Sequence, residues 1–199
     1  MKINKTNAAR LLDKAKVTYE LVPYEVDEND LSAIHVAAQL GENVEQVFKT
    51  LILQGDKNGY FVCIIPGADE VDLKKAAKAS GNKSCQMIPV KELLPLTGYI
   101  RGGCSPVGMK KLFPTYLHFT AEHFEQIYIS AGVRGLQLLL SPPPTWSGRL
   151  KPPWQIWSQK TNKGIGIKQD QNFRNVYCFW SLERINCLPD NFSILNIRL

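Results

Sequence analysis

Apolar residues recur three and four positions apart in three segments of the first part of the chain, a spacing that predicts amphipathic helices. The first helix would follow Asn7, a residue type favoured at the N-cap, and the second would span Ala33–Leu40 and end at Gly41. Asp72 is a candidate cap for the third helix, which would end at Gly81.

Elsewhere in this part of the chain, apolar and polar residues alternate, which predicts β-strands. Residues 47–54 and 60–65 flank a turn that begins and ends with glycine, so we expect them to form a hairpin. Further strands are expected at residues 17–22, 116–119, 126–130 and 135–140. This mixture predicts an α/β, or mixed α+β, domain built of packed layers.

The pattern of elements ends near Pro142. All four tryptophans and six of the twelve prolines lie from that residue onward, and no apolar period persists there. We therefore expect residues 1–142 to form one domain and residues 143–199 to be an atypical C-terminal tail. The charge of +6 is uneven as well, because residues 1–141 hold 16 basic and 15 acidic residues, whereas the remainder holds 8 and 3. In the domain, only local basic patches can therefore indicate nucleic-acid binding.

The composition disfavours several classes of protein. The chain has no 18-residue apolar run and its first residues lack the apolar segment of a signal peptide, so we expect neither a membrane span nor secretion. The five cysteines show no CxxC pair and the three histidines no ligand spacing. This pattern predicts reduced thiols, a cytoplasmic location and no metal site.

One lysine lies within an apolar strand pattern. Alternation in residues 47–53 places Lys49 on the same face as Val47, Leu51 and Leu53. A charge there is costly unless it is paired or placed in a ligand cleft, where the ammonium could bind phosphate or offset an ester oxyanion. The alternative is an edge-strand lysine that reaches solvent along its methylenes.

Residues 97–111 combine four glycines with basic side chains. Glycine lets the backbone approach a ligand and present N–H groups to an anion, and Gly102 and Gly103 are adjacent. Arg101, Lys110 and Lys111 add positive charge suited to a phosphodiester. A long irregular turn with solvated basic side chains is the alternative.

No residue has sequence neighbours that mark it as a nucleophile. Ser130 lies in a turn of small residues without a nearby His–Asp pair, and such a turn either holds a hydroxyl in a pocket or is structural. Cys104 has no evident activating base, and Cys63 lies in an apolar strand, so both are expected to be structural. Tyr24 would line a cleft or pack in the core.

Five short segments occur in a distinctive order. They are VFKTL at 47–51, VDLKK at 71–75, TGY at 97–99, GGCSP at 102–106 followed by a Lys-Lys pair at 110–111, and SAG at 130–132 followed by RGL at 134–136. As a set they resemble the bacterial YbaK-like cysteinyl-tRNA(Pro) deacylases, which are relatives of the editing domain inserted in prolyl-tRNA synthetases. The resemblance covers residues 5 to about 142.

The resemblance implies a fold and a reaction. The fold would be a strongly curved mixed β-sheet flanked by helices. The reaction would be trans-editing hydrolysis of a mischarged aminoacyl-tRNA, Cys-tRNA(Pro) above all, without metal or organic cofactor. In this family the substrate cysteine's thiol is thought to attack the ester, and prolyl-tRNA synthetase is a partner.

The resemblance also implies site residues. The essential lysine of the family falls on Lys49. Positions that line the family's pocket match Tyr24, Thr50, Gly102 and Ser130. The glycine turn, which also contains Arg101 and Gly103, would receive the terminal adenosine of the tRNA.

Two positions depart from the family pattern. A carboxylate often found seven residues after the serine is Gln137 here, and an aromatic often found before the second helix is absent from residues 31–33. The choice among Cys, Ala and Ser esters therefore stays open. A non-catalytic aminoacyl-tRNA or nucleotide-binding module of the same fold is the alternative of another class, and release of free amino acid would distinguish the two.

The tail suggests a shift of reading frame. When the third base of each codon in residues 143–157 is grouped with the first two of the next, the code permits the peptide ADLVRAVKATLADM. This peptide is rich in helix formers and resembles the family's closing helix. The junction of Thr161 and Asn162 can encode a stop. One extra base in the Pro142 and Pro143 codons would suffice, and a genuine extension is the alternative.

Overall fold

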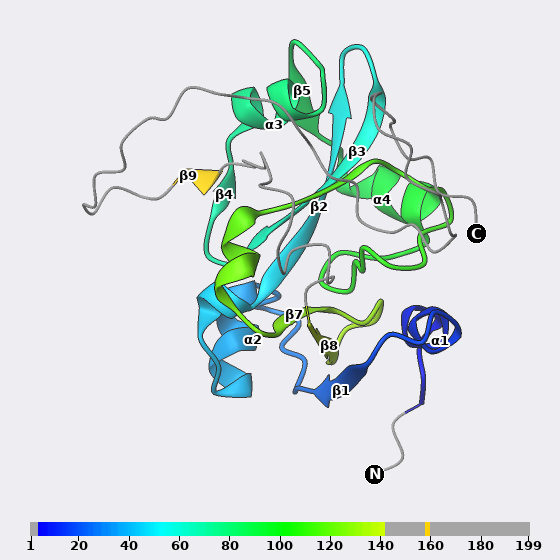
Figure 1. Ribbon diagram of the computed structural model, residues 1–199, viewed down its shortest axis with the longest axis vertical. Coiled ribbons are helices and arrows are strands. Elements are labelled where there is room, and N and C mark those ends of the chain that lie inside the picture. Colours follow the sequence, from blue (N-terminus) through cyan, green and yellow to red (C-terminus); the bar gives the residue numbers. More distant parts are fainter. Residues whose placement is uncertain (1–3, 142–157, 160–199) are drawn as a thin grey trace, which may run out of the picture.

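The computed structural model describes residues 4–141 and 158–159, which form two main β-sheets with helices packed around them (Figure 1). One sheet has the strand order β1-β8-β7, the other has the order β5-β2-β3-β6, and β4 pairs with β9. The helices are α1 (Asn7–Lys14), α2 (Ala33–Leu40), α3 (Leu73–Ala79) and α4 (Val90–Thr97), with 3-10 turns at Val44–Gln46 and Phe119–His123. The strands are β1 (Tyr19–Pro23), β2 (Phe48–Gly55), β3 (Gly59–Pro66), β4 (Glu70–Val71), β5 (Cys85–Met87), β6 (Thr115–Leu117), β7 (Ile127–Ser130), β8 (Leu136–Leu140) and β9 (Ser158–Gln159).

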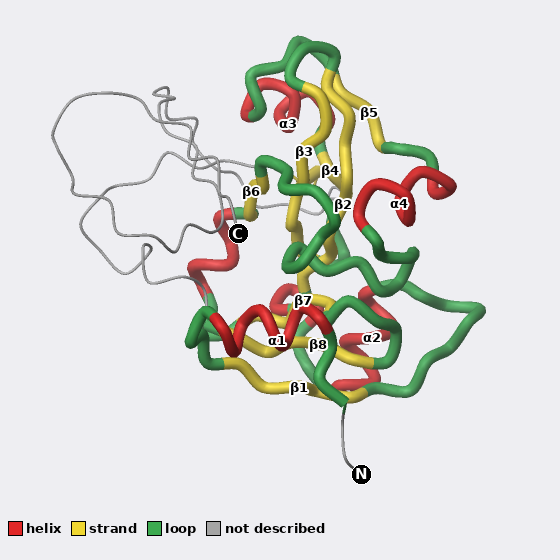
Figure 2. Tube along the Cα trace, turned by 90° about the vertical axis from the view of Figure 1, so that its right-hand side faces the viewer, coloured by secondary structure: helices red, strands yellow, loops and turns green. Residues whose placement is uncertain are grey.

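The two main sheets meet through a parallel bridge between Val47 and Tyr128, and their strands run in different directions (Figure 2). In the larger sheet, β2 and β3 form the predicted hairpin, which the pair Gly55 and Gly59 closes, and β6 lies parallel to β3. Both pairings of the smaller sheet are antiparallel. The predicted mixed α/β class is confirmed, whereas the strong curvature expected of the sheet stays a prediction.

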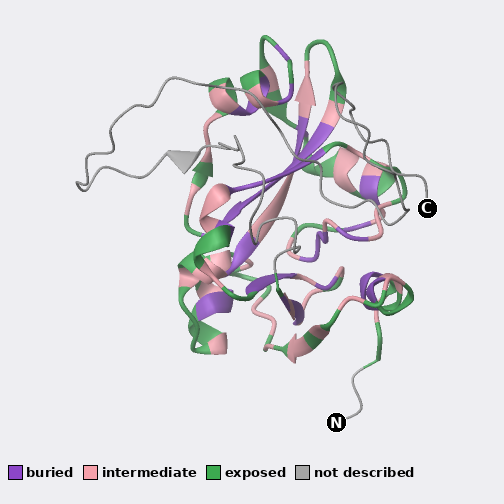
Figure 3. Cartoon of the chain, in the orientation of Figure 1, coloured by how far each residue is buried: buried purple, intermediate pink, exposed green. Residues whose placement is uncertain are grey.

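The side chains of β2 are divided between its two faces. Phe48 and Ile52 belong to the largest core cluster together with Leu12 of α1, whereas Leu53 joins a second cluster against α3. Val47 belongs to a third cluster against α2. Much of β2 and β3 is consequently buried (Figure 3). A polar side chain in the middle of β2 therefore has apolar neighbours on most sides.

The helix boundaries follow local capping chemistry. The cap of α1 is Thr6, whose side chain accepts the N–H of Ala9 at 3.2 Å, so the prediction of Asn7 as cap is wrong, and Asn7 is the first helical residue. Gly41 ends α2 as predicted, with a left-handed φ of 69°. Asp72 caps α3 as predicted and accepts two backbone N–H groups.

Helix α4 and strand β5 were not predicted. The N-cap of α4 is Pro89, which makes no side-chain cap hydrogen bond, and Pro95 lies inside the helix, so the sequence lacks the usual signals. Leu93 and Leu96 pack against the largest core cluster, and this tertiary contact compensates for the weak local pattern. Strand β5 has three residues and is defined by its pairing with β2.

Candidate functional site

Lys49 lies on β2, opposite Ile65 of β3. Its side chain is half-buried, and Nζ donates a hydrogen bond to the backbone oxygen of Gly67 at 3.0 Å. Burial lowers the pKa of this lysine from its ordinary value of 10.5, and the nearby carboxylates of Asp69 and Glu70 act in the opposite direction. In the sheet order β2 lies between β5 and β3, but β5 pairs only with residues 53–55 of β2, so the strand beside Lys49 in this sheet is β3. The interpretation of Lys49 as an edge-strand lysine that reaches solvent stays an alternative.

Gly67 brings α2 and the turn after β3 against the lysine strand. Its N–H donates to the oxygen of Val47 at 2.7 Å. A Cβ at this position would lie 2.4 Å from the Cβ of Ala33, the first residue of α2. Only glycine permits this approach, and the oxygen of the same residue accepts from Lys49. The sequence analysis missed Gly67, although the dipeptide Pro66-Gly67 is a turn signal.

Ser130 lies on the same side of the sheets as Lys49. The bridge pairs Val47 with Tyr128 in parallel, and two residues further along each strand are Lys49 and Ser130. Alternation therefore directs both side chains to the face that Val47 and Tyr128 share in one apolar cluster with Ala37 of α2. The Ser130 hydroxyl accepts the N–H of Gly132 at 3.2 Å, as in a structural turn.

Gln137 is the register partner of Ser130 on β8. Its side chain is 5% exposed, and its Oε1 has no hydrogen-bond partner among the described residues. An unpaired buried carbonyl is costly, so its presence distinguishes this position from an ordinary core residue. The residue that departs from the family pattern thus lies directly beside the predicted pocket serine.

Thr50 is not brought together with Lys49 through its side chain. Alternation places it on the face of Phe48 and Ile52, which belong to the largest core cluster. Its Oγ1 is buried and has no hydrogen-bond partner within residues 4–141 and 158–159. Because it is the chain neighbour of Lys49, its backbone lies beside the lysine even though its hydroxyl points to the other face.

The glycine turn packs against the turn that follows Ser130. Gly102 has a left-handed φ of 82°, and a Cβ there would lie 3.2 Å from Leu31 and 3.3 Å from Nε of Arg134. At Gly103 a Cβ would lie 3.0 Å from the backbone nitrogen of Arg134. The two turns therefore touch backbone to backbone, and Arg101 is exposed at their border.

Tyr24 is joined to the same turn. Its N–H donates to the oxygen of Gly135 at 3.0 Å, immediately after β1 ends, and its side chain is half-buried. The structure therefore gathers Tyr24, the glycine turn and the Ser130 turn into one region.

Arg134 is a further residue of this region that the sequence analysis did not select as a site residue. Its Nε donates to the backbone oxygen of Arg101 at 3.0 Å, and its guanidinium forms an ion pair with Glu28. The signal that could have found it is its place in the RGL segment at 134–136.

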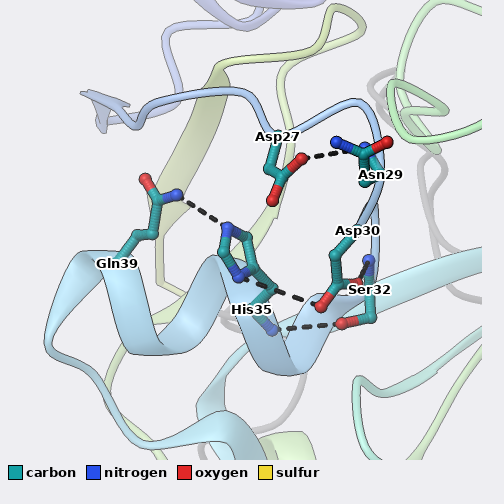
Figure 4. Close-up of polar contacts among 6 residues, drawn as sticks. All are labelled: Asp27, Asn29, Asp30, Ser32, His35 and Gln39. Atoms are coloured by element: carbon teal, nitrogen blue, oxygen red, sulfur yellow. Dashed lines mark hydrogen bonds and ion pairs between the residues drawn. The ribbon is translucent and has the colours of Figure 1, made fainter.

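The loop between β1 and α2 is ordered by its own polar side chains (Figure 4). Asp27 accepts the N–H of Asn29 at 2.8 Å, and Asp30 accepts the N–H of Ser32 at 2.9 Å. His35 of α2 lies 2.8 Å from Gln39 through Nε2 and 3.8 Å from Asp30 through Nδ1. This network fixes the conformation of the loop that contains Glu28 and Leu31, the two residues that contact the turns.

The buried thiols are unsuited to nucleophilic chemistry. Cys104 is 9% exposed, and burial raises its pKa to about 12. Burial likewise raises the pKa of Cys63, which lies in the apolar core. Both are therefore protonated thiols near neutral pH.

Two structural absences apply to the described part of the chain. Among residues 4–141 and 158–159, no three His, Cys, Asp or Glu side chains gather as they would around a metal ion. Within the same residues, none of the helices has the length and apolar character needed to cross a membrane.

Residues 28–143 match the sequence model of the aminoacyl-tRNA editing domain family. The chain is 51% identical over 138 residues to EbsC of Enterococcus faecalis, which bears the name Cys-tRNA(Pro)/Cys-tRNA(Cys) deacylase; the match covers 69% of this chain and 84% of EbsC. It is 29% identical over 108 residues to a proline–tRNA ligase of Thermosipho melanesiensis, covering 49% of this chain and 19% of the ligase.

Solved structures share the fold. A structure described as a trans-editing enzyme for prolyl tRNA synthetase superposes with a TM-score of 0.58 at 24% identity, covering 68% of this chain and 86% of that one. The hypothetical protein APE2540 superposes with a TM-score of 0.61 at 22% identity, covering 67% and 87%.

Proposed function

Because this chain belongs to the aminoacyl-tRNA editing domain family, we propose that it removes a wrong amino acid from tRNA by hydrolysing the aminoacyl ester, with Cys-tRNA(Pro) as its substrate. The identity of 51% to EbsC, named for Cys-tRNA(Pro) and Cys-tRNA(Cys), supports the choice of amino acid. The similarity to proline–tRNA ligases supports the choice of tRNA. The protein is thus an ester hydrolase that acts in trans on tRNA(Pro), and prolyl-tRNA synthetase is the proposed partner.

The observation that carries the proposal is the half-buried ammonium of Lys49, held at 3.0 Å by the oxygen of Gly67 on the face shared with Ser130. A charge in a partly dry environment acts strongly on a nearby developing charge. We assign Lys49 to the carbonyl oxygen of the ester, which becomes negative when the ester is attacked. The ammonium then stabilises the transition state more than the ground state.

The attacking group is the substrate's own thiol. Its sulfur bonds to the carbonyl carbon of the same cysteine, the bond from that carbon to the ribose oxygen breaks, and the thiol proton ends on the ribose oxygen. Water then opens the cyclic thioester to free cysteine. The buried, protonated state of Cys104 supports a reaction that uses no protein nucleophile, and the protein contributes orientation and charge.

The remaining residues bind the substrate. We place the terminal adenosine against the turn of Gly102 and Gly103, and the exposed Arg101 beside the phosphodiester. Tyr24 and Ser130 line the aminoacyl pocket. Thr50 contributes chiefly through the backbone next to Lys49, because its side chain lies on the opposite face of β2.

Deacylation of tRNA(Pro) charged separately with Cys, Ala and Ser tests the proposal. We expect the Cys ester to be hydrolysed much faster than the other two, and Lys49→Ala to lower that rate by about 10²–10³-fold, the usual effect of removing one oxyanion donor. Lys49→Arg should also fail, because a planar guanidinium doesn't replace a compact ammonium.

The matched control is Lys57→Ala, which removes an exposed lysine from the β2–β3 turn and should leave the rate unchanged. Equal rates on Cys and Ala esters would exclude thiol assistance and favour alanine editing. Binding of charged tRNA without release of amino acid would favour a non-catalytic module. Normal turnover by Lys49→Ala would exclude the role given to the lysine.

A further inference from the structure

Most of the proposed substrate contacts lie on three segments that are distant in sequence. These segments are the loop from Tyr24 to Ser32, the turn at residues 100–103 and the turn at residues 130–135. The first two are irregular backbone between strands and helices, and the third is the loop that connects the paired strands β7 and β8, so no strand ladder joins one segment to another. The geometry of the pocket therefore depends on how the three segments are joined.

We propose that Arg134 is a positioning residue that joins these three segments into one rigid pocket wall, a role that rests on the proposed function. Arg134 itself lies in the third segment. Its Nε donates to the oxygen of Arg101 in the second segment at 3.0 Å, and Nη1 pairs with Glu28 in the first. The planar guanidinium has donors on two sides and so connects two partners at a defined angle.

Backbone packing transmits the position of Arg134 to the glycine turn. A Cβ on Gly103 would lie 3.0 Å from the nitrogen of Arg134 and 3.0 Å from the carbonyl carbon of Val133. A Cβ on Gly102 would lie 3.3 Å from Nε of Arg134. Because the turns are already in contact, a shift of one requires a shift of the other.

The same turn also holds the first segment by its backbone. The oxygen of Gly135, next to Arg134, accepts the N–H of Tyr24 at 3.0 Å. The ion pair with Glu28 is a second link to this loop, four residues further along the chain, which is at most about 15 Å because consecutive Cα atoms are about 3.8 Å apart. Together with the polar network within the loop, these two links fix the position of the loop relative to the turn at residues 130–135.

Exposure indicates that the ion pair serves geometry more than stability. The Arg134 side chain is 26% exposed and that of Glu28 is 69% exposed. Pairs this accessible to solvent contribute little to folding free energy. A reacting ester, in contrast, is sensitive to small displacements of the groups that orient it.

The test compares Arg134→Met, Arg134→Lys and Glu28→Gln in the full chain, with Arg10→Met as control because Arg10 is an exposed arginine of α1. We expect Arg134→Met to lower kcat/KM on Cys-tRNA(Pro) by about 10²-fold, the effect of a small misplacement. Arg134→Lys should restore part of the loss, since one ammonium can reach one partner but not both. Glu28→Gln removes only the ion pair and should lower kcat/KM less than Arg134→Lys does.

Amide hydrogen exchange supplies a readout independent of activity. In Arg134→Met, the Tyr24 and Gly103 amides, which donate to Gly135 and Ile100, should exchange faster, whereas amides of the β2–β3 hairpin should not change. Uniformly faster exchange, or an activity loss that follows the loss of folded protein, would show a merely structural role and overturn the proposal. Wild-type kcat/KM together with wild-type exchange would overturn it as well.

The exchange result also separates this proposal from the proposed function. If the wild-type protein releases no amino acid from any charged tRNA, the proposed function fails. Local loosening at Tyr24 and Gly103 in Arg134→Met would in that case still establish the joining role, and its absence would refute it.

Discussion

At the scale of the residue, Lys49 combines two opposed influences on one ammonium. Burial among apolar side chains lowers its pKa, and the carboxylates of Asp69 and Glu70 raise it. Neither carboxylate forms an ion pair with Lys49 within 4.0 Å, and Nζ donates its hydrogen bond to the oxygen of Gly67. Within the described residues, the ammonium therefore has no carboxylate in direct contact that would neutralise its effect on a substrate.

The pH dependence of deacylation should report this balance. The protonated lysine is the active form, so the rate should fall as pH rises through the pKa of Lys49. That pKa is lowered from 10.5, so the fall should begin at a lower pH than for a surface lysine. Asp69→Asn removes a carboxylate that raises the pKa and should move the fall to still lower pH.

The measurement is the pH profile of kcat/KM on Cys-tRNA(Pro), corrected with Lys49→Ala for spontaneous ester hydrolysis. Lys57→Ala should reproduce the wild-type profile, because Lys57 is exposed in the hairpin turn. A profile that doesn't move in Asp69→Asn, or moves to higher pH, would contradict the proposed electrostatics.

Cys104→Ala should leave the deacylation rate nearly unchanged. The thiol is 9% exposed and its pKa is raised to about 12, so it supplies no thiolate near neutral pH. Single-turnover hydrolysis of Cys-tRNA(Pro) measures this, with alkylation of the substrate thiol as the complementary treatment that should stop turnover. Loss of activity in Cys104→Ala at unchanged stability would instead indicate a protein nucleophile.

At the scale of the element, the two glycines of the glycine turn are required for different reasons. Gly102 has a φ of 82°, which disfavours any side chain, and a Cβ there would also contact Leu31 and Arg134. The φ of Gly103 does not lie in the left-handed region, but a Cβ at this residue would lie 3.0 Å from backbone atoms of the Ser130 turn. Gly59 has a φ of 72° and open space around it, so it isolates the conformational cost alone.

Substitution of these glycines by alanine should separate conformation from packing. Gly59→Ala should cost about 1–2 kcal/mol of unfolding free energy, the penalty of a left-handed residue, and leave KM unchanged. Gly103→Ala should separate the two turns and raise KM for Cys-tRNA(Pro) severalfold. Chemical denaturation and steady-state kinetics measure both quantities, and an unchanged KM in Gly103→Ala would show that the turn contact doesn't shape the binding site.

At the scale of the whole molecule, the family match ends at residue 143, where the sequence pattern also changes. Residues 142–157 and 160–199 lie outside the described part of the chain, so the frameshift hypothesis remains a prediction. We propose that the gene carries one extra base near the Pro142 and Pro143 codons. The domain of residues 1–142 would then lack the closing helix encoded in the other frame.

Sequencing the gene across these codons tests the hypothesis directly. Removal of one cytosine should yield a chain that ends near Thr161 with the helix-forming peptide ADLVRAVKATLADM, and this chain should have a higher Tm because an apolar surface is covered. A chain stopped after Pro142 is the control. A gene without an open shifted frame, or an unchanged Tm after the correction, would favour a genuine extension.

The success of sequence-based prediction varied with the locality of each signal. The helix ending at Gly41, the helix capped by Asp72 and the β2–β3 hairpin were predicted, because their caps and turn residues are contiguous in the chain. Helix α4 was missed because Pro95, a residue that disfavours helix interiors, lies within it. The helix is stabilised instead by the tertiary packing of Leu93 and Leu96.

The candidate site divides in the same way. The apolar alternation gave the face on which Lys49 lies and left its role open, and the family resemblance assigned it the essential role. Gly67 and Arg134 were not selected, because their importance arises from partners 18 and 33 residues away in the chain. A pattern of neighbouring residues in the sequence does not predict contacts between residues so far apart.

By itself, the sequence determined the periodic elements, the family and the position of the lysine, because each depends on residue types at fixed local spacing. Only the tertiary structure decided that the loop with Tyr24, the glycine turn and the Ser130 turn meet, and that Arg134 bonds to Arg101 and pairs with Glu28. It also decided that Phe48 and Ile52, on the face of β2 that alternation gives to Thr50, are buried in the largest core cluster. The physical reason is that the pairing of β1, β8 and β7 and the bridge to β2 bring together segments that are far apart along the chain.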